Sequence, residues 1–316
     1  MYLIFDTETT GLPRNWGAPI SDTDNWPRCV QIAWQLHDEM GNIIEHQDYI
    51  INPEGYDIPF DAEKIHGIST ELAQKEGHPL KDVLQKFNEA LSKSKFIVGH
   101  NLGFDVNIMS CEFYRLEMDS PMGQMPILDT CTEVTASLLK IPGGRGGKFK
   151  LPTLTELHEY LFGQKFLEAH NAIADVEATT RCFLELIRKE IFSKNELEVD
   201  EDYFREFKLK NPNPIKLIGL KQINLKAASD KLRQQFGEKG NVPISKETIT
   251  KNQQELVDVD FVHLHNHTQF SVLQSTISVQ DLVKAAVKNK MAAVAMTDTG
   301  NMMGAFHFVR DVLYHN

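Results

Sequence analysis

Four acidic residues of this chain stand where carboxylates could bind metal ions: Asp6, Glu8, Asp105 and Asp175. Asp6 and Glu8 end the apolar run "YLIF" and are two residues apart, so in a β-strand both side chains would point to the same face. Neighbouring carboxylates repel one another, and a divalent cation removes that repulsion. Oxygen ligands without a cysteine or histidine cluster indicate Mg²⁺ or Mn²⁺ rather than zinc.

Two such ions would clamp the attacking water and the leaving oxygen of an in-line phosphoryl displacement. His170 precedes Asp175 in "HNAIAD" and could take the proton from that water, because histidine titrates near neutral pH. Each feature alone has a simpler explanation. An Asp-x-Glu pair at a strand end is more often a turn or a cap, and an Asp in the first turn of a helix usually interacts with the helix dipole. The joint order of these residues favours the metal site.

The elements that must position the acids can be predicted from hydrophobic patterns. Over residues 1–192, strand-like runs such as "VQIAWQL" and "KFIVGHN" alternate with helical patterns. We expect an α/β domain with a mixed sheet. Asp105 would follow a strand in the first turn of a helix, and Asp175 would lie in the first turns of a helix over 171–191 whose apolar stripe packs on the sheet. The acids could then converge at one edge of the sheet.

The stretches "FDTETTGL", "HNLGFD" and "HNAIAD" resemble the three motifs of the DEDDh family of 3′–5′ exonucleases, specifically the proofreading (epsilon) subunits of bacterial DNA polymerase III. The resemblance covers about residues 1–190 and includes all five catalytic positions. It implies a ribonuclease-H-like fold and two Mg²⁺ or Mn²⁺ ions. It also implies that His170 is the general base and that the metal ligands are Asp6, Glu8, Asp105 and Asp175.

The same resemblance implies a seat for the 3′-terminal nucleotide. "TTGL" resembles the part that contacts the sugar and base, and "AEKIHGIS" resembles a stretch that places His66 in the same pocket. For His66, a packed or capping role is an equal alternative. The substrate-binding residues expected on this basis are Thr7, Thr9, Gly11, Leu12, His66, Asn101 and Phe104.

The segment "KIPGGRGGKFK", residues 140–150, is a basic and glycine-rich exception in an acidic chain. One interpretation is a solvated, mobile loop. The other is a flexible contact to a phosphate backbone. The residues that would make that contact are Lys140, Arg145, Lys148 and Lys150.

Beyond the first domain the composition changes twice. Residues 193–258 are polar and turn-prone, and we expect a linker that is partly helical or disordered. In residues 259–316, "FVHLHNHTQFSVLQS" and "AAVAMTDTGNMMGAFHF" resemble the start of the PHP domain of the DNA polymerase III alpha subunit. This resemblance implies the first two βα units of an incomplete PHP-type barrel, since a (β/α)₈ barrel takes about 250 residues.

The PHP-like segment departs from its family at metal-binding positions. Gln274 and Ser275 stand where the family has Asp-Gly, and Thr299 stands where it has His. The residues expected to remain from that site are His265, His267 and Asp298. We therefore expect a vestigial metal site.

Composition limits the remaining possibilities. The net charge of −11 argues against binding nucleic acid through a broad basic field, but not against an enzyme whose metal ions neutralise phosphate. The 4 cysteines form no C-x-x-C pair and suit a reducing compartment, and the apolar runs are too short for a membrane span. We expect a cytoplasmic protein without a membrane partner.

Together these features predict a 3′–5′ exonuclease that releases 5′-mononucleotides from single-stranded DNA ends. We expect it to proofread for a DNA polymerase III alpha subunit, in cis or in trans, with other replisome subunits as further candidate partners. The chain would then be an N-terminal fragment of a longer fusion. Three alternatives remain: an exonuclease of RNA ends like oligoribonuclease or ribonuclease T, a non-catalytic docking module, and a phosphoesterase centred on the PHP-like histidines.

Overall fold

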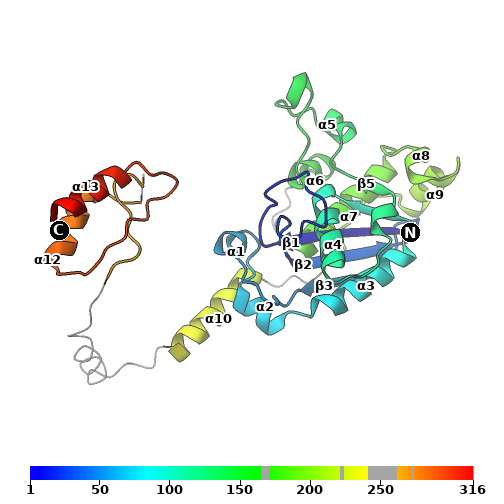
Figure 1. Cartoon of the computed structure of the whole chain (residues 1–316). Coiled ribbons are helices and arrows are strands. Elements are labelled where there is room, and N and C mark those ends of the chain that lie inside the picture. The colour runs from blue at the N-terminus through cyan, green and yellow to red at the C-terminus, as the bar shows by residue number, and fades with distance from the viewer. Residues whose placement is uncertain (165–170, 221–223, 241–261, 272–273, 316) are drawn as a thin grey trace. The chain divides into compact units, whose positions relative to one another are not determined.

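The computed structural model describes residues 1–164, 171–220, 224–240, 262–271 and 274–315 (Figure 1). The chain divides into two compact units, Met1–Lys239 and Gly240–Asn316. Among the described residues, no helix combines the length and the apolar character required to cross a lipid bilayer.

The first unit contains all named strands and most of the helices. The strands are β1 (Tyr2–Thr9), β2 (Cys29–His37), β3 (Ile43–Ile50), β4 (Phe96–Gly99) and β5 (Ile127–Asp129). The α-helices are α1 (Phe60–His66), α2 (Thr70–Glu76), α3 (Leu80–Lys93), α4 (Gly103–Arg115), α5 (Glu133–Leu139), α6 (Leu154–Phe162), α7 (Ala172–Arg188), α8 (Lys194–Leu197), α9 (Tyr203–Lys210) and α10 (Leu225–Gly240). Two short 3₁₀ turns are η1 (Met122–Gln124) and η2 (Arg145–Gly147).

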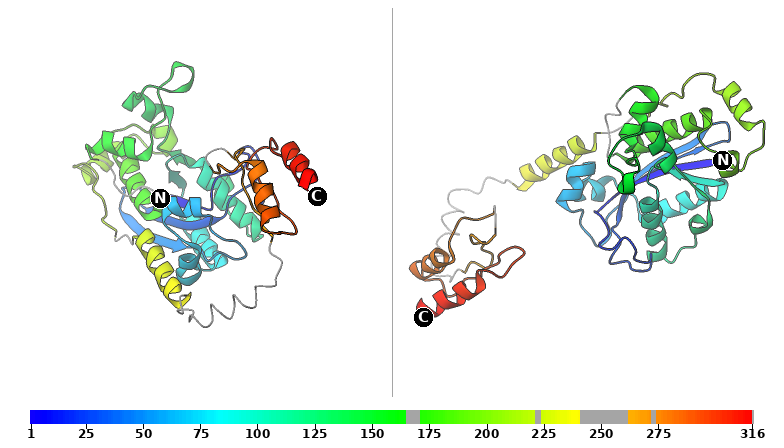
Figure 2. Two further views of the ribbon diagram at one scale, coloured as in Figure 1. Left: turned by 90° about the vertical axis from the view of Figure 1, so that its left-hand side faces the viewer. Right: turned by 90° about the horizontal axis from the view of Figure 1, so that it is seen from above.

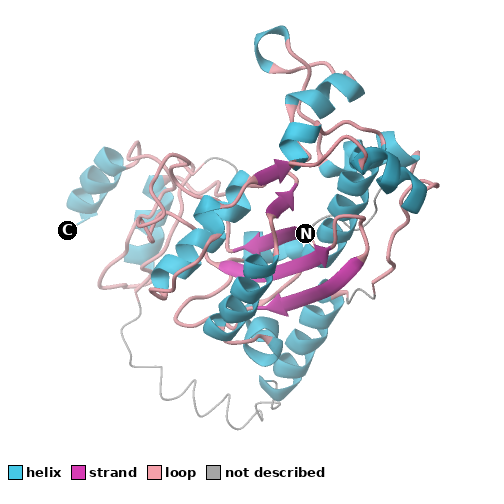
Figure 3. Ribbon diagram, turned by 90° about the vertical axis from the view of Figure 1, so that its right-hand side faces the viewer, coloured by secondary structure: helices cyan, strands magenta, loops and turns pink. Residues whose placement is uncertain are grey.

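The strands form one sheet (Figure 3), and their order in it is β3-β2-β1-β4-β5. β1 and β2 pair antiparallel, as do β2 and β3. β1 and β4 pair parallel, as do β4 and β5. The predicted α/β fold with a mixed central sheet is confirmed, and β1 lies at its centre.

Alternating residues of β1 face the two sides of the sheet. Leu3 and Phe5 are buried in an apolar cluster with α3 and α4. Tyr2 and Ile4 belong to a second cluster with α7. The sheet therefore lies between two helical layers (Figure 2), and this alternation decides which helix each functional side chain of β1 meets.

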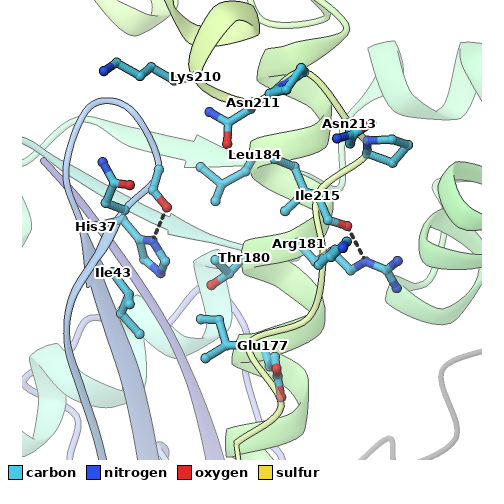
Figure 4. Close-up of a pocket in the computed structure, with 16 residues that line it drawn as sticks. His37, Ile43, Glu177, Thr180, Arg181, Leu184, Lys210, Asn211, Asn213 and Ile215 are labelled. Atoms are coloured by element: carbon cyan, nitrogen blue, oxygen red, sulfur yellow. Dashed lines mark hydrogen bonds between the residues drawn. The ribbon is translucent and has the colours of Figure 1, made fainter.

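The first unit continues past residue 192, where we expected the exonuclease domain to end. Phe204 and Phe207 of α9 are buried in the cluster of α7, so apolar residues within a polar stretch hold this segment on the domain. The following segment crosses α7, where the Arg181 Nε donates a hydrogen bond to the Ile215 backbone oxygen at 2.8 Å (Figure 4). A pocket of about 400 Å³ lies between this segment, α7 and the β2–β3 turn, with His37 and Thr180 among its lining residues.

Helix α10 packs on α1 and α2, still within the first unit (Figure 1). Leu225 and Leu232 are buried there in a small apolar cluster. The Ser229 hydroxyl accepts a hydrogen bond from the Ser69 N–H at 3.0 Å and donates one to the Gly67 oxygen at 2.7 Å. The sequence predicted a helix in this region, and these contacts make its first half part of the exonuclease unit.

The second unit has helices α12 (Val279–Lys288) and α13 (Ala305–His315). Where two strands were expected, the described residues form one isolated parallel bridge, between His263 and Val294. A bond from the Ala295 N–H to the His263 oxygen (2.9 Å) continues this pairing. Within the part of the second unit that the structure describes, these two short parallel segments have few partners for their backbone groups, so they do not form an extended ladder.

Candidate active site

Asp6, Glu8 and Asp175 form an acidic cluster at the end of β1. Asp6 and Glu8 continue the face of β1 that carries Tyr2 and Ile4, and this face meets α7. Asp175 lies in the first turn of α7. Ligand oxygens of the three carboxylates all lie within 4.8 Å of one another. The convergence that the sequence predicted is therefore observed for these three acids.

Asp105 reaches the site from the opposite layer, in the first turn of α4. Its Oδ1 accepts hydrogen bonds from the Thr7 N–H at 3.1 Å and from the Thr7 hydroxyl at 2.6 Å. Thr7 lies between the two acids of β1, so its side chain points to the other face of the sheet. Asp105 is outside the group of three carboxylates, but its charge raises the pKa of Asp6.

Burial and mutual repulsion make this cluster hard to ionise. Burial raises the pKa of Asp6 well above its usual range, and the charges of Asp105 and Asp175 raise it further. Burial also raises the pKa of Glu8 to about 8, with the same two neighbours adding to the shift. For Asp105, burial raises the pKa to about 7 against the opposing effect of the hydrogen bonds from Thr7. A cation would offset this repulsion, and an all-oxygen ligand set fits Mg²⁺ or Mn²⁺.

The beginning of α7 is fixed by its own cap. The Asn171 side chain accepts a hydrogen bond from the Ile173 N–H at 3.1 Å. α7 then packs on β1, β2 and β4 through a long buried face, and Val176 and Phe183 are part of it. Asp175 is thereby held at a defined position above the sheet.

Asp129 was not among the residues predicted from the sequence. It ends β5, and its two carboxylate oxygens accept hydrogen bonds from the backbone N–H groups of Asn101 (2.8 Å) and Leu102 (2.9 Å). Asn101 has a positive φ of 61°, so the turn from β4 to α4 needs such support. Asp129 thus positions the start of the helix that carries Phe104 and Asp105.

Apart from His66, the residues expected around the 3′-terminal nucleotide lie at the end of β1, in the turn after it and at the start of α4. The Thr9 hydroxyl donates a hydrogen bond to the Gly11 oxygen at 2.7 Å, and Gly11 has a φ of 147° that favours glycine. Leu12 is 73% exposed. Phe104 is half-buried on the first turn of α4. Thr7 has the different role described above, as the hydrogen-bond donor to Asp105.

His66 ends α1 and is buried. Its Nδ1 accepts a hydrogen bond from the Ile68 N–H at 3.1 Å. This contact is compatible with the capping alternative and leaves the substrate role a prediction. His170, the expected general base, lies outside the described residues.

The basic loop meets acids of neighbouring helices. Lys148 pairs with Glu133, and Lys150 pairs with Glu156 at 2.8 Å. Lys140 follows the end of α5 with a left-handed backbone conformation. The Arg145 side chain lies outside the described part of the structure. Phosphate contact by these four residues stays a prediction, and for Lys148 and Lys150 it would require exchange of an ion pair.

In the second unit, Asp298 is occupied by hydroxyl and backbone donors. It accepts hydrogen bonds from the Thr268 N–H (2.6 Å), the Thr268 hydroxyl (2.7 Å) and the Ser271 hydroxyl (2.8 Å). The centroids of the His265 and His267 rings lie 4.7 Å apart. Within the described residues, the group with the spacing of metal ligands is Asp6, Glu8 and Asp175. His265, His267 and Asp298 do not form a second such group.

Comparison with protein families identifies the fold that carries this site. The model of a family described as "Exonuclease" (RNase_T) matches residues 3–183, which is more than half of the chain. The chain belongs to this exonuclease family. The model of the PHP domain matches residues 263–315. The DEDDh 3′–5′ exonuclease region is thus followed by part of a PHP domain.

The similar proteins include a DNA polymerase III PolC-type and two DNA polymerase III subunits. The chain is 33% identical over 197 residues to a DNA polymerase III PolC-type of Streptococcus thermophilus, covering 62% of this chain and 12% of the relative. It is 28% identical over 187 residues to the DNA polymerase III subunit epsilon of Rickettsia felis, covering 58% and 72%. A 51-residue match to the DNA polymerase III subunit alpha of Aquifex aeolicus has 49% identity and covers 16% and 4%. The chain therefore spans only about an eighth of the PolC-type relative.

Solved structures of Escherichia coli exonuclease I are similar at a lower level. One of them, in complex with a dT13 oligonucleotide, superimposes with a TM-score of 0.47 and 21% sequence identity, covering 62% of this chain and 45% of that chain.

Proposed function

We propose that the chain hydrolyses phosphodiester bonds at the 3′ ends of single-stranded DNA and releases 5′-mononucleotides. The observation that carries this proposal is the convergence of Asp6, Glu8 and Asp175 within 4.8 Å, beside Asp105. Family membership supplies the 3′–5′ exonuclease chemistry that such a cluster supports.

Asp6, Glu8, Asp105 and Asp175 would hold two Mg²⁺ or Mn²⁺ ions. Such a pair, when bound, supplies charge stabilisation for both the attacking and the leaving oxygen. Thr7 holds the Asp105 carboxylate through two hydrogen bonds, so that this acid keeps one orientation as the site fills. We assign His170 the role of general base, which accepts the proton of the attacking water.

The turn after β1 and the start of α4 would receive the terminal nucleotide. Leu12 offers an exposed apolar side chain, and Phe104 offers a ring one residue before Asp105. A frayed, unpaired end can enter such a site, whereas a paired end must first be opened. We therefore propose that the chain proofreads for a DNA polymerase III alpha subunit, in cis or in trans, in keeping with its PolC-type and epsilon relatives.

The direct test is a time course with 5′-labelled DNA and RNA oligonucleotides of the same sequence, with Mg²⁺ or Mn²⁺. We expect a ladder that shortens from the 3′ end, faster for DNA than for RNA, and no ladder in EDTA. Faster shortening of RNA would favour an enzyme of RNA ends. No shortening of either substrate by the metal-loaded chain would contradict the proposal.

A further inference from the structure

The loop between β1 and β2, residues 10–28, is held in one shape by its own side chains. The Asn15 N–H donates a hydrogen bond to the Asn25 Oδ1 at 2.7 Å, and the Asn25 Nδ2 donates one to the Asn15 oxygen at 3.0 Å. The Trp26 Nε1 donates to the Pro19 oxygen at 3.1 Å. Because these bonds join its two arms, the loop can present a side chain at a fixed position.

Helix α4 anchors the far arm of this loop. The Arg115 Nη2 donates a hydrogen bond to the Thr23 oxygen at 2.7 Å. Arg115 and Arg28 also pair with the fully buried carboxylate of Glu112, at 3.1 and 3.0 Å. The loop is therefore fixed to the same helix that carries Asp105 at its other end.

The loop exposes an aromatic ring next to the proposed nucleotide seat. Trp16 is 59% exposed, and its ring lies against that of Phe104, with 5.7 Å between centroids and 49° between the planes. The other tryptophans, Trp26 and Trp34, are buried. Phe104 is next to Asp105 in the chain, so its contact with Trp16 places the indole in the neighbourhood of the proposed nucleotide seat.

The same loop supplies a positive charge. Arg14 is exposed and lines a hollow of about 510 Å³ together with Leu12. Arg28 and Arg115 line this hollow too, but their charges are paired with Glu112. An exposed indole and an exposed guanidinium on the same loop suit single-stranded nucleic acid, because bases stack on aromatic rings and phosphates interact with cations.

We propose that Trp16 is a stacking platform for the nucleobase that precedes the 3′-terminal nucleotide, and that Arg14 contacts the phosphate beside it. The inference rests on the proposed function for its substrate class, and it adds a second nucleotide subsite on the loop 10–28. The enzyme would thereby grip two successive unpaired nucleotides before hydrolysis. A single unpaired nucleotide would gain less from the site than a longer frayed end.

Tryptophan fluorescence tests this proposal without hydrolysis. Trp16 is the exposed indole among the three tryptophans of the chain, so a stacked base should quench its emission. The full chain carrying Asp6→Asn is titrated with a ten-nucleotide oligo(dT) in Mg²⁺. We expect saturable quenching, which Trp16→Phe abolishes. No quenching at saturating oligo(dT), with binding verified by anisotropy of a labelled oligonucleotide, would overturn the proposal.

Steady-state kinetics of the active chain provide a second test of the Trp16 proposal. Trp16→Leu should raise KM for oligo(dT) about 5- to 150-fold, the equivalent of one base stack, and leave kcat unchanged. Trp16→Phe should restore most of the loss. Tyr114→Ala, which removes an exposed ring at the far end of α4, is the matched control and should change neither constant. An equal KM for Trp16→Leu and the wild type would overturn the proposal.

Two further measurements place the base and the phosphate. With thymidine 5′-(methyl phosphate), which has one base and no ring on the leaving group, Trp16→Leu should hydrolyse the ester at the wild-type rate. A loss equal to that on oligo(dT) would contradict the assigned position. Arg14→Gln should make the slope of log affinity for oligo(dT) against log salt concentration shallower by about 0.7.

The two proposals can fail separately. If oligo(dT) quenches the tryptophan emission of the wild type but is not hydrolysed, the proposed function fails while the subsite stands.

Discussion

Thr7 donates two hydrogen bonds to one oxygen of Asp105, from its backbone N–H at 3.1 Å and from its hydroxyl at 2.6 Å. Asp6 and Glu8, on either side of Thr7, point to the opposite face of β1. One strand thus supplies two acids to one side of the site and orients a third acid on the other. The stretch Asp6-Thr7-Glu8 therefore orients Asp105 in addition to supplying two carboxylates to the cluster.

This relationship predicts an effect of Thr7 on catalysis. Thr7→Val removes the hydroxyl donor and keeps the volume, so Asp105 loses a charge-assisted hydrogen bond worth about 1.5–3 kcal/mol. We expect the hydrolysis rate at limiting Mg²⁺ to fall about 10- to 100-fold, and the Mg²⁺ concentration for half-maximal rate to rise. Thr7→Ser should recover most of the activity. Equal Mg²⁺ dependence in the wild type and Thr7→Val would show that the hydroxyl does not orient Asp105.

A second prediction concerns His170. As a general base it contributes to proton transfer and not to metal binding, so His170→Ala should lose about 10²- to 10⁴-fold in rate. The affinity for Mn²⁺, measured by calorimetry, should stay near the wild-type value. A joint loss of Mn²⁺ affinity and activity would make His170 a ligand instead.

The raised pKa values predict how stability depends on pH in the metal-free chain. Glu8 has a pKa of about 8 in the folded state and an ordinary value of 4.5, so its ionisation destabilises the fold as pH rises between these values. We expect the addition of Mg²⁺ to raise the melting temperature more at pH 8 than at pH 5. Thermal melts at the two pH values, with and without Mg²⁺, measure the pH dependence of the melting temperature and the increase that Mg²⁺ causes.

Glu8→Gln provides the comparison for these melts. Its metal-free melting temperature should fall less between pH 5 and pH 8 than that of the wild type, because the group that titrates is gone. A parallel decline in both proteins would mean that other groups dominate the pH dependence and that ionisation of Glu8 does not destabilise the fold.

A fourth prediction tests the docking of α10. Ser229→Ala leaves the buried Ser69 N–H and Gly67 oxygen without their partner, at a cost of about 1–3 kcal/mol. Hydrogen exchange of the α10 amides should accelerate accordingly. Lys231→Ala, an exposed change on the same helix, should leave exchange unaltered. Unchanged exchange in Ser229→Ala would show that this hydroxyl does not hold the helix.

The sequence predicted those parts of the site that follow from local geometry. Two-residue spacing placed Asp6 and Glu8 on one face of a strand, and helix starts placed Asp105 and Asp175. Asp129 could not be found in this way, because it supports the backbone of Asn101, 28 positions away. Nothing in its immediate neighbours marks that contact.

Composition was a weaker guide than periodicity at the end of the first unit. The polar character of residues 193–258 indicated a linker, yet Phe204 and Phe207 bury their rings beside α7. Ser229 meets Ser69 over a separation of 160 residues, which no local pattern reports. Long-range pairing of a few residues, rather than average polarity, decides where the compact unit ends.

The most direct test of the carboxylate site is a calorimetric titration of the chain with Mn²⁺, run in parallel on Asp6→Asn. We expect about two Mn²⁺ ions per wild-type chain. We expect a clear loss of stoichiometry or affinity in Asp6→Asn, because this variant removes a charge from the acidic cluster. Identical titrations of the two proteins would contradict the claim that Asp6, Glu8, Asp105 and Asp175 act as a metal site.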